Sequence, residues 1–211
     1  MISSPTSAAD FLPEDRSLSA LREAARSCQG CALYQDATQT VFGEGSQEAK
    51  IVFIGEQPGD EEDRIGRPFV GPAGRLFDRA MIDAGIDREA VYITNAVKHF
   101  KWEPRGRRRI HKKPQDREIK ACHPWLLNEV QVIGPQVVAC LGVTAATAAF
   151  GKAVRLKDYR GNFFQTPLSD LTFVTTHPSA LLRIQEEETR QLEYRRFVDE
   201  LRLVQSRLLA G

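Results

Sequence analysis

A cationic segment, residues 98–117, holds the densest set of charged and reactive side chains in this 211-residue chain. Its sequence, KHFKWEPRGRRRIHKKPQDR, contains nine Lys and Arg against two acidic residues. Ordering so many like charges is unfavourable unless a polyanion neutralises them, so the segment favours a nucleic acid partner over a merely solvated loop. His111 follows three of the arginines, with Ile110 between them. Because an imidazole titrates near neutral pH, this residue is a candidate for chemistry on that partner.

Three further polar residues, Glu56, Asn95 and His177, stand at or just after the ends of predicted strands. A carboxylate can take part in catalysis, an amide can pair with a donor and an acceptor on the edge of a nucleobase, and a histidine can donate to a developing oxyanion. The structural alternatives are a capping or salt-bridging Glu, a turn-forming Asn and a packed His. The carboxyl ends of parallel strands meet at one edge of a sheet, so we expect these residues to converge.

Glycine-rich turns accompany two of the candidate sites. In Gly55-Glu-Gln-Pro-Gly59 the Gly and Pro residues are typical of a stiff turn whose backbone N–H groups face a ligand. Phe69 lies in the second turn, where an aromatic face can be presented to a planar ligand; the alternative is a core residue. The chain has neither the G-x-G-x-x-G spacing nor a Walker A motif, so nucleoside triphosphate chemistry is not expected.

The chain contains four cysteines: Cys28, Cys31, Cys122 and Cys140. No cation precedes Arg16 and no apolar run reaches the length of a membrane span, so we expect a cytoplasmic protein without membrane association. In that compartment the cysteines are expected to be thiols or metal ligands rather than disulfides. Their spacing is compatible with an iron–sulfur cluster, with zinc, or with four buried thiols.

The composition is that of an ordinary globular protein, with 42% hydrophobic and 27% charged residues and a net charge of +1. We therefore expect a single domain over 1–211, with 1–13 as a loose N-terminal lead-in. Strands are predicted at 50–55, 91–97, 136–141 and 173–176, and helices at 14–27, 75–84, 116–133, 144–150 and 187–209. This alternation predicts a three-layer α/β/α fold with a central, mainly parallel four-stranded sheet.

Taken together, the motifs resemble those of the uracil-DNA glycosylase superfamily. They are GEQPGDEE (55–62), GRPFVGPAGRLF (66–77), TNAVKHFK (94–101), RRRIH (107–111) and HPSALLR (177–183). The four cysteines resemble those of its iron–sulfur branch, family four. Within that branch, Gln57 and the basic loop ending in RRRIH are similar to the UdgX subgroup.

The resemblance implies a structural [4Fe–4S] cluster on the four cysteines, and it implies roles for the candidate residues. Phe69 would stack on a flipped-out uracil, Asn95 would read its edge, His177 would stabilise the uracil anion and Glu56 the sugar cation. The remaining substrate-binding residues would be Gln57, Gly55, Gly59 and Ser179. The cations expected on the DNA backbone are Arg107, Arg108, Arg109, Lys98 and Lys112.

In the UdgX subgroup the histidine that ends the basic loop attacks the sugar, and the matching residue is His111. The resemblance therefore predicts that the protein excises uracil and stays covalently attached to the DNA. Neighbouring cations disfavour a charged imidazole, whereas phosphates bound to them have the opposite effect. Two alternatives remain: a multiple-turnover family-four glycosylase and a non-catalytic iron–sulfur DNA-binding module. In each case we expect a monomer acting on DNA, with single-stranded uracil-containing DNA as a substrate of the enzyme.

Overall fold

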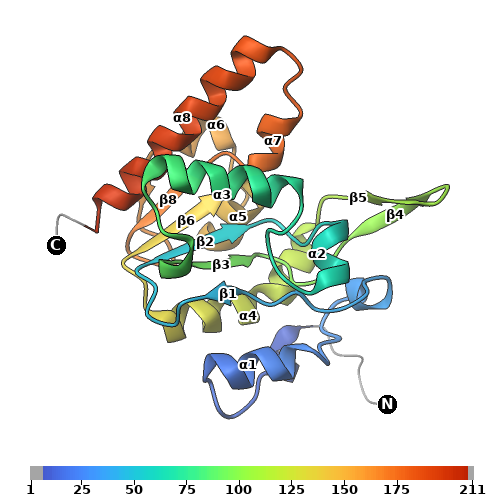
Figure 1. Ribbon diagram of the computed structural model, residues 1–211. Helices are drawn as coiled ribbons and strands as arrows, with labels where there is room; N and C mark the ends of the chain where they lie inside the picture. The colour runs from blue at the N-terminus through green and yellow to red at the C-terminus, as the bar shows by residue number, and fades with distance from the viewer. Residues whose placement is uncertain (1–6, 209–211) are drawn as a thin grey trace, which may run out of the picture.

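A mixed six-stranded sheet forms the centre of the computed structural model, which describes residues 7–208 (Figure 1). The strand order is β1-β3-β2-β6-β8-β7. The inner four strands are parallel, and β1 and β7 pair antiparallel at the edges. The bounds are β1 Glu44–Gly45, β2 Ile51–Gly55, β3 Tyr92–Asn95, β6 Val137–Leu141, β7 Phe163–Phe164 and β8 Thr172–Thr175. The predicted parallel sheet is confirmed, and two edge strands of two residues each raise its strand count from four to six.

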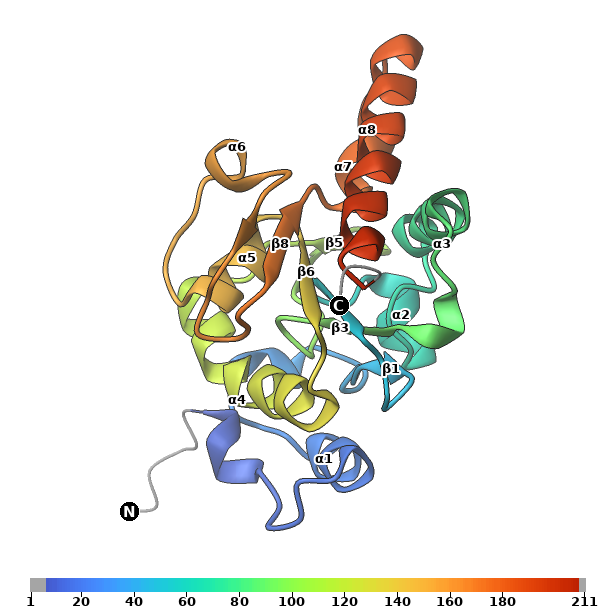
Figure 2. The ribbon, with the colours of Figure 1, turned by 90° about the vertical axis from the view of Figure 1, so that its left-hand side faces the viewer.

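Helices cover both faces of this sheet, as the three-layer prediction requires (Figure 2). On one face lie α4 and α5, with α1 packed against α4; on the other lie α3 and α8. The bounds are α1 Leu18–Ala25, α2 Asp60–Ile65, α3 Pro72–Ala84, α4 Asp116–Ile133, α5 Val143–Phe150, α6 Leu156–Tyr159, α7 Pro178–Leu182 and α8 Glu187–Ser206, with 3₁₀ turns η1 Ala8–Phe11, η2 Ala32–Gln35 and η3 Arg88–Ala90.

The inner strands are apolar throughout because both of their faces are covered. In β2, Val52 and Ile54 pack toward α4, whereas Ile51 and Phe53 pack toward α3 and α8. This burial explains why the strand is a continuous apolar run in the sequence rather than an alternating one. The polar residues that follow such strands are thereby brought to one edge of the sheet.

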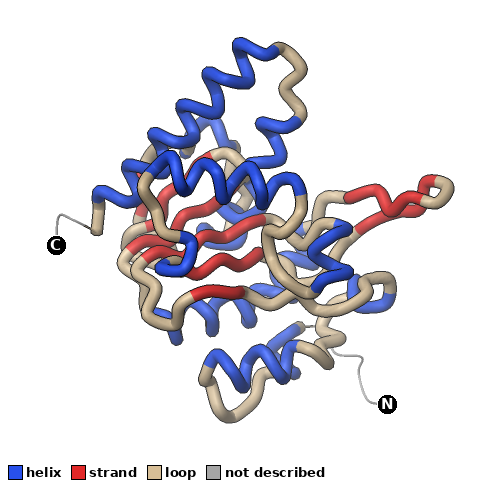
Figure 3. The backbone as a smooth tube through the Cα atoms, in the orientation of Figure 1, coloured by secondary structure: helices blue, strands red, loops and turns tan. Residues whose placement is uncertain are grey.

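The cationic segment forms a β-hairpin rather than a loop. Strands β4 Trp102–Arg105 and β5 Arg108–His111 pair antiparallel, with Trp102 opposite His111, and the hairpin projects from the body of the molecule (Figure 3). Gly106 closes the turn with a φ of 60°, a conformation that suits glycine. His111 therefore lies at the base of the hairpin, and the remaining hairpin arginines lie nearer its tip.

The N-terminal segment is ordered where the structure describes it. Ser7 caps the η1 turn, Ala8 is 1% exposed, and Phe11 and Leu12 pack against the core. The expectation of a loose lead-in is therefore wrong for residues 7–13, because apolar contacts hold them against the core; residues 1–6 lie outside the described range. Among residues 7–208, no helix is both long and apolar enough to cross a membrane.

Candidate active site

The residues predicted to converge do meet, in a cavity of about 710 Å³ at the carboxyl ends of the parallel strands. Glu56 follows β2, Asn95 ends β3, and His177 lies two residues beyond β8. His111 reaches the same cavity from the end of β5. Other predicted site residues that line it are Gln57, Gly59, Phe69 and Ser179. The cavity is thus lined by a carboxylate, an amide, an aromatic ring and two imidazoles.

Glu56 is held between a hydroxyl and an imidazole. Thr144, at the start of α5, donates its hydroxyl hydrogen to Oε2 of Glu56. Oε1 lies 3.3 Å from Nε2 of His111, whose side chain is 42% exposed. One carboxylate oxygen is therefore fixed by the fold, and the other faces the histidine.

Desolvation lowers the pKa of His111 below its usual value of 6.5. Arg183 acts in the same direction, and Glu56 opposes both. The neighbouring cation that lowers the pKa is thus Arg183, at the C-terminal end of α7, rather than the hairpin arginines that the sequence indicated. A lowered pKa keeps the imidazole neutral, with one ring nitrogen free to attack an electrophile.

His177 is neutral and has a fixed tautomer. Desolvation, together with His111 and Arg183, lowers its pKa to about 4. The backbone N–H of Ser179 donates to Nδ1 of His177 over 3.1 Å, so Nδ1 carries no hydrogen. In the neutral ring the hydrogen must then be on Nε2, which makes that nitrogen a hydrogen-bond donor. Ser179, which was predicted to bind substrate and lines the cavity, orients His177 through this N–H, and its hydroxyl accepts from Arg183.

Phe69 and Asn95 meet over Gly55. Phe69 has a φ of 56°, a strained conformation for a bulky side chain and typical of functional positions. Its ring lies 5.4 Å from the Phe77 ring and 5.9 Å from the His177 ring, measured between centroids. A Cβ on Gly55 would lie 2.3 Å from Oδ1 of Asn95 and 2.6 Å from the Phe69 ring. Gly55 therefore leaves the space in which the amide and the aromatic ring come together.

Gln57 does not point into the cavity as a free substrate ligand. It is 7% exposed, and its Nε2 donates to the carbonyls of Lys101 and Lys112, each over 3.1 Å. The backbone N–H of Lys101 donates to Oε1 of Gln57 over 3.2 Å. The side-chain amide is thus used to join the two strands of the hairpin at its base, where His111 lies.

Arg109 anchors the hairpin rather than facing solvent. Its guanidinium forms ion pairs with Asp60, at 2.5 Å, and Asp63, at 2.6 Å, and it covers the rings of Phe100 and Trp102. The side chain is only 15% exposed. The prediction that Arg109 contacts a DNA phosphate is therefore wrong for this conformation, because two carboxylates already neutralise it.

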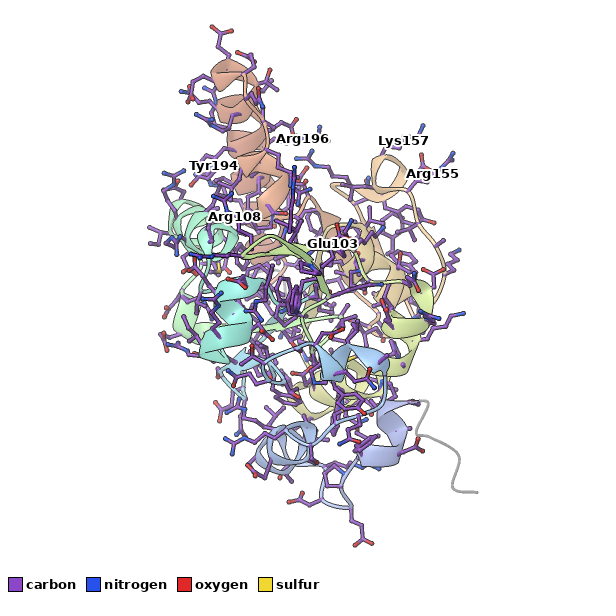
Figure 4. The ribbon with its side chains drawn as sticks, turned by 90° about the vertical axis from the view of Figure 1, so that its right-hand side faces the viewer. Glu103, Arg108, Arg155, Lys157, Tyr194 and Arg196 are labelled. Carbon is purple, nitrogen blue, oxygen red and sulfur yellow. The ribbon has the colours of Figure 1, made fainter. Side chains whose placement is uncertain are left out.

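The prediction that Lys98 contacts a DNA phosphate is also wrong. Its side chain is 1% exposed and forms an ion pair with Glu129 inside the core, so it cannot reach a phosphate. Lys112 is exposed but pairs with Glu103 at 2.7 Å. Arg107 and Arg108 are exposed and make no ion pair within residues 7–208; Figure 4 labels Arg108 and Glu103 on the two hairpin strands. Of the predicted backbone contacts, these two arginines are the ones left available.

The four cysteines are free thiols. Cys28, Cys122 and Cys140 belong to one core cluster, against which Cys31 packs. Nε1 of Trp125 donates to the sulfur of Cys28, and the backbone N–H of Lys98 to that of Cys122, each over 3.2 Å.

Burial raises the pKa of the Cys122 thiol to about 12, although the Lys98 charge opposes that shift. Within the described residues, no three potential ligand side chains converge as a metal site. The donor chemistry suits a thiolate centre, and the cluster remains a prediction.

Several residues that shape the cavity were missed by the sequence analysis. Thr144 looked like part of an unremarkable Ala-rich helix, and Arg183 ended a motif without an assigned role. Glu62 accepts from the backbone N–H groups of Gly59 and Gly71, and so ties the first turn to the start of α3. For Thr144, the signal was its place just after Gly142, at the carboxyl end of a predicted strand.

A doubly covered parallel sheet with an amide and an aromatic ring in a cavity at its carboxyl edge defines an α/β protein with a polar cavity beyond its parallel strands. The sequence signature of the Uracil DNA glycosylase superfamily matches residues 42–202, and the chain belongs to this superfamily. The predicted superfamily is thus confirmed.

Three relatives are named type-4 uracil-DNA glycosylases. The protein of Thermotoga maritima is 40% identical over 171 residues, covering 81% of this chain and 85% of the relative. That of Sulfurisphaera tokodaii is 36% identical, covering 79% and 76%. That of Saccharolobus solfataricus is 35% identical, covering 83% and 85%.

Proposed function

We propose that this protein excises uracil from DNA and that His111 then captures the sugar covalently. The observation that carries the proposal is the position of His111, with Nε2 3.3 Å from Oε1 of Glu56, in the cavity that also holds Phe69, Asn95 and His177. A histidine serving only as a DNA-channel residue has no need of a carboxylate partner beside the base pocket.

The first step breaks the bond between N1 of uracil and C1′ of the sugar. The bonding electrons leave with uracil, whose charge is stabilised at O2 by the Nε2–H of His177. Phe69 stacks on the flipped base, and the Asn95 amide pairs with its edge. The sugar is left as an oxocarbenium ion, whose positive charge the Glu56 carboxylate stabilises.

In the second step the ring nitrogen of His111 that carries no hydrogen attacks C1′. A new N–C1′ bond forms, and the imidazole becomes an imidazolium whose charge Glu56 neutralises. The expelled uracil anion takes a proton from solvent. An N-alkyl imidazolium is a poor leaving group without assistance, so the adduct persists and each molecule reacts once.

A second function, multiple-turnover hydrolysis, is supported by the names of the type-4 relatives. In this case water attacks C1′, and Glu56 orients it. His111 would then only line the cavity. Multiple-turnover hydrolysis fits the names of the relatives at least as well as covalent capture does.

A denaturing gel with single-stranded uracil-containing DNA separates the two functions. Covalent capture yields a protein–DNA band that survives heat and detergent, in an amount equal to the protein added. Hydrolysis yields alkali-cleavable DNA in excess of the protein and no such band. Binding without either product would leave a DNA-binding module and contradict both.

We also propose that Cys28, Cys31, Cys122 and Cys140 hold a [4Fe–4S] cluster. The support for this proposal is chemical: four free thiols, two of which receive N–H hydrogen bonds, are the donor type that iron–sulfur clusters use. The cluster would join the segment after α1 to α4 and β6. It would stabilise the fold, and the excision step uses only the side chains of the cavity.

A further inference from the structure

A buried ion pair contacts the backbone of Asn95, a residue that lines the cavity. The side chains of Lys98 and Glu129 are 1% and 0% exposed, respectively. Removing two charges from water is costly, and an apolar pair of similar volume is often at least as stable. Packing alone therefore gives no reason for this pair, and its contacts indicate what it positions.

All three ammonium hydrogens of Lys98 have acceptors. They are Oγ1 of Thr94 at 2.6 Å, the backbone carbonyl of Asn95 at 2.8 Å, and Oε2 of Glu129. Oε1 of Glu129 in turn accepts from the Tyr92 hydroxyl at 2.9 Å. The pair is thus attached to three of the four residues of β3, the strand that ends at Asn95.

The Asn95 carbonyl is located where the sheet ladder ends. The β2–β3 register stops at Gly55 opposite Asn95, and the chain then turns, with the N–H of Ala96 donating to Gly55. Within residues 7–208 the hydrogen-bond donor to the Asn95 carbonyl is Lys98, and the Asn95 side-chain amide has no partner of its own. The direction of that amide therefore depends on the backbone that Lys98 holds.

We propose that Lys98 is a positioning residue for base recognition, which acts by fixing the Asn95 backbone so that its amide faces uracil. Glu129 supplies the counter-charge of this buried ammonium. The inference rests on the proposed excision of uracil. It assigns different tasks to the two members of the pair: loss of Lys98 should impair base recognition, and loss of Glu129 should lower stability.

Two variants separate these tasks. Glu129→Gln keeps the Lys98 contact to Asn95 but removes the counter-charge, so it should lower the melting temperature and leave the single-turnover rate of uracil release near the parent value. The double variant Lys98→Met/Glu129→Gln has no uncompensated charge, so it should regain thermal stability. It should nevertheless release uracil about 10- to 100-fold more slowly, because a small misplacement of a recognition group is enough for such a loss.

A weaker affinity of the double variant for free uracil, with unchanged binding of uracil-free single-stranded DNA, would locate the defect in base recognition. A double variant as stable and as active as the parent would overturn the proposal and leave Lys98 as a partner for Glu129 only. A parent that releases no uracil would contradict the proposed function instead. In that event a crystal structure of the double variant still tests the inference, which requires a displaced Asn95 backbone and fails if Asn95 is unmoved.

Discussion

Nε2 of His111 and Oε1 of Glu56 lie 3.3 Å apart, although His111 ends a strand of the hairpin and Glu56 follows a strand of the central sheet. Gln57, which follows Glu56, donates to the carbonyls of Lys101 and Lys112, the residues that flank the hairpin at its base. The central sheet thereby sets the position of the hairpin histidine. Because His111 is held beside Glu56, its proposed role as the nucleophile can be tested by substitution.

Replacing His111 by Ser should abolish the heat-stable protein–DNA band. A serine hydroxyl is a poor nucleophile at neutral pH, and the smaller side chain leaves room for water beside Glu56. Uracil release should then continue with turnover, measured as free uracil per protein molecule. A native gel showing unchanged DNA binding is the control, and an undiminished covalent band would identify another nucleophile.

The exposed hairpin arginines should set the salt dependence of DNA binding. The double variant Arg107→Ala/Arg108→Ala should weaken binding across sequences and reduce the slope of log K against log salt by about 1.4, at about 0.7 per phosphate contact on single strands. Fluorescence anisotropy at a series of salt concentrations measures this slope. A slope equal to that of the parent would show that these hairpin arginines do not contact the DNA phosphates.

Arg109→Ala is the matched comparison for that experiment. Its guanidinium is neutralised by Asp60 and Asp63, so the salt slope should change little. Stability should fall by about 3 kcal/mol instead, because the Asp63 side chain, 0% exposed, loses its ion-pair partner. Urea denaturation measures the loss, and an unchanged midpoint would show that the hairpin anchor is dispensable.

The parts of this protein that its sequence predicted are those defined by local patterns. Continuous apolar runs ended by Gly or polar residues identified the parallel strands and hence the convergence of Glu56, Asn95 and His177. The state of each cation was not predictable, because paired and free arginines look alike in sequence. The partner of Lys98 lies 31 positions away, and Asp60 lies 49 positions from Arg109. Only the folded chain shows which charges are already neutralised.

Covalent capture should persist below pH 6.5. Desolvation and Arg183 lower the pKa of His111, so the neutral ring survives to lower pH than in a free imidazole. The capture rate should therefore fall, by about tenfold per pH unit, only once the pH passes below the lowered pKa. Arg183→Gln should raise the pKa of His111, so the capture rate should begin to fall at a higher pH than in the parent. A fall in the capture rate centred at or above pH 6.5 in the parent would show that the cavity favours the charged ring.

Gly55→Ala should damage the base pocket more than the fold. The added Cβ would lie 2.3 Å from Oδ1 of Asn95 and 2.6 Å from the Phe69 ring, so one of these groups must move. We expect uracil release to fall about 100-fold. Gly85→Ala is the control: its Cβ meets open space, and with a φ of 75° it should cost about 1 kcal/mol of stability and leave release unchanged. Equal activity losses in both variants would contradict the assignment of the pocket.

Cys140→Ala distinguishes a cluster ligand from a buried thiol. Cys140 is 0% exposed in β6, and burial raises its pKa, so a metal must displace its proton in order to bind. If Cys140 is a simple buried thiol, its replacement should lower the free energy of unfolding about as much as Val138→Ala on the same strand and face, roughly 2 kcal/mol. Loss of a cluster ligand should cost far more and should also remove the brown colour, iron and sulfide that we expect in anaerobically purified parent protein. Zinc in place of iron would give the same stability difference in a colourless protein. Equal losses of unfolding free energy for the two variants, in a colourless and metal-free protein, would show that the four cysteines are structural thiols.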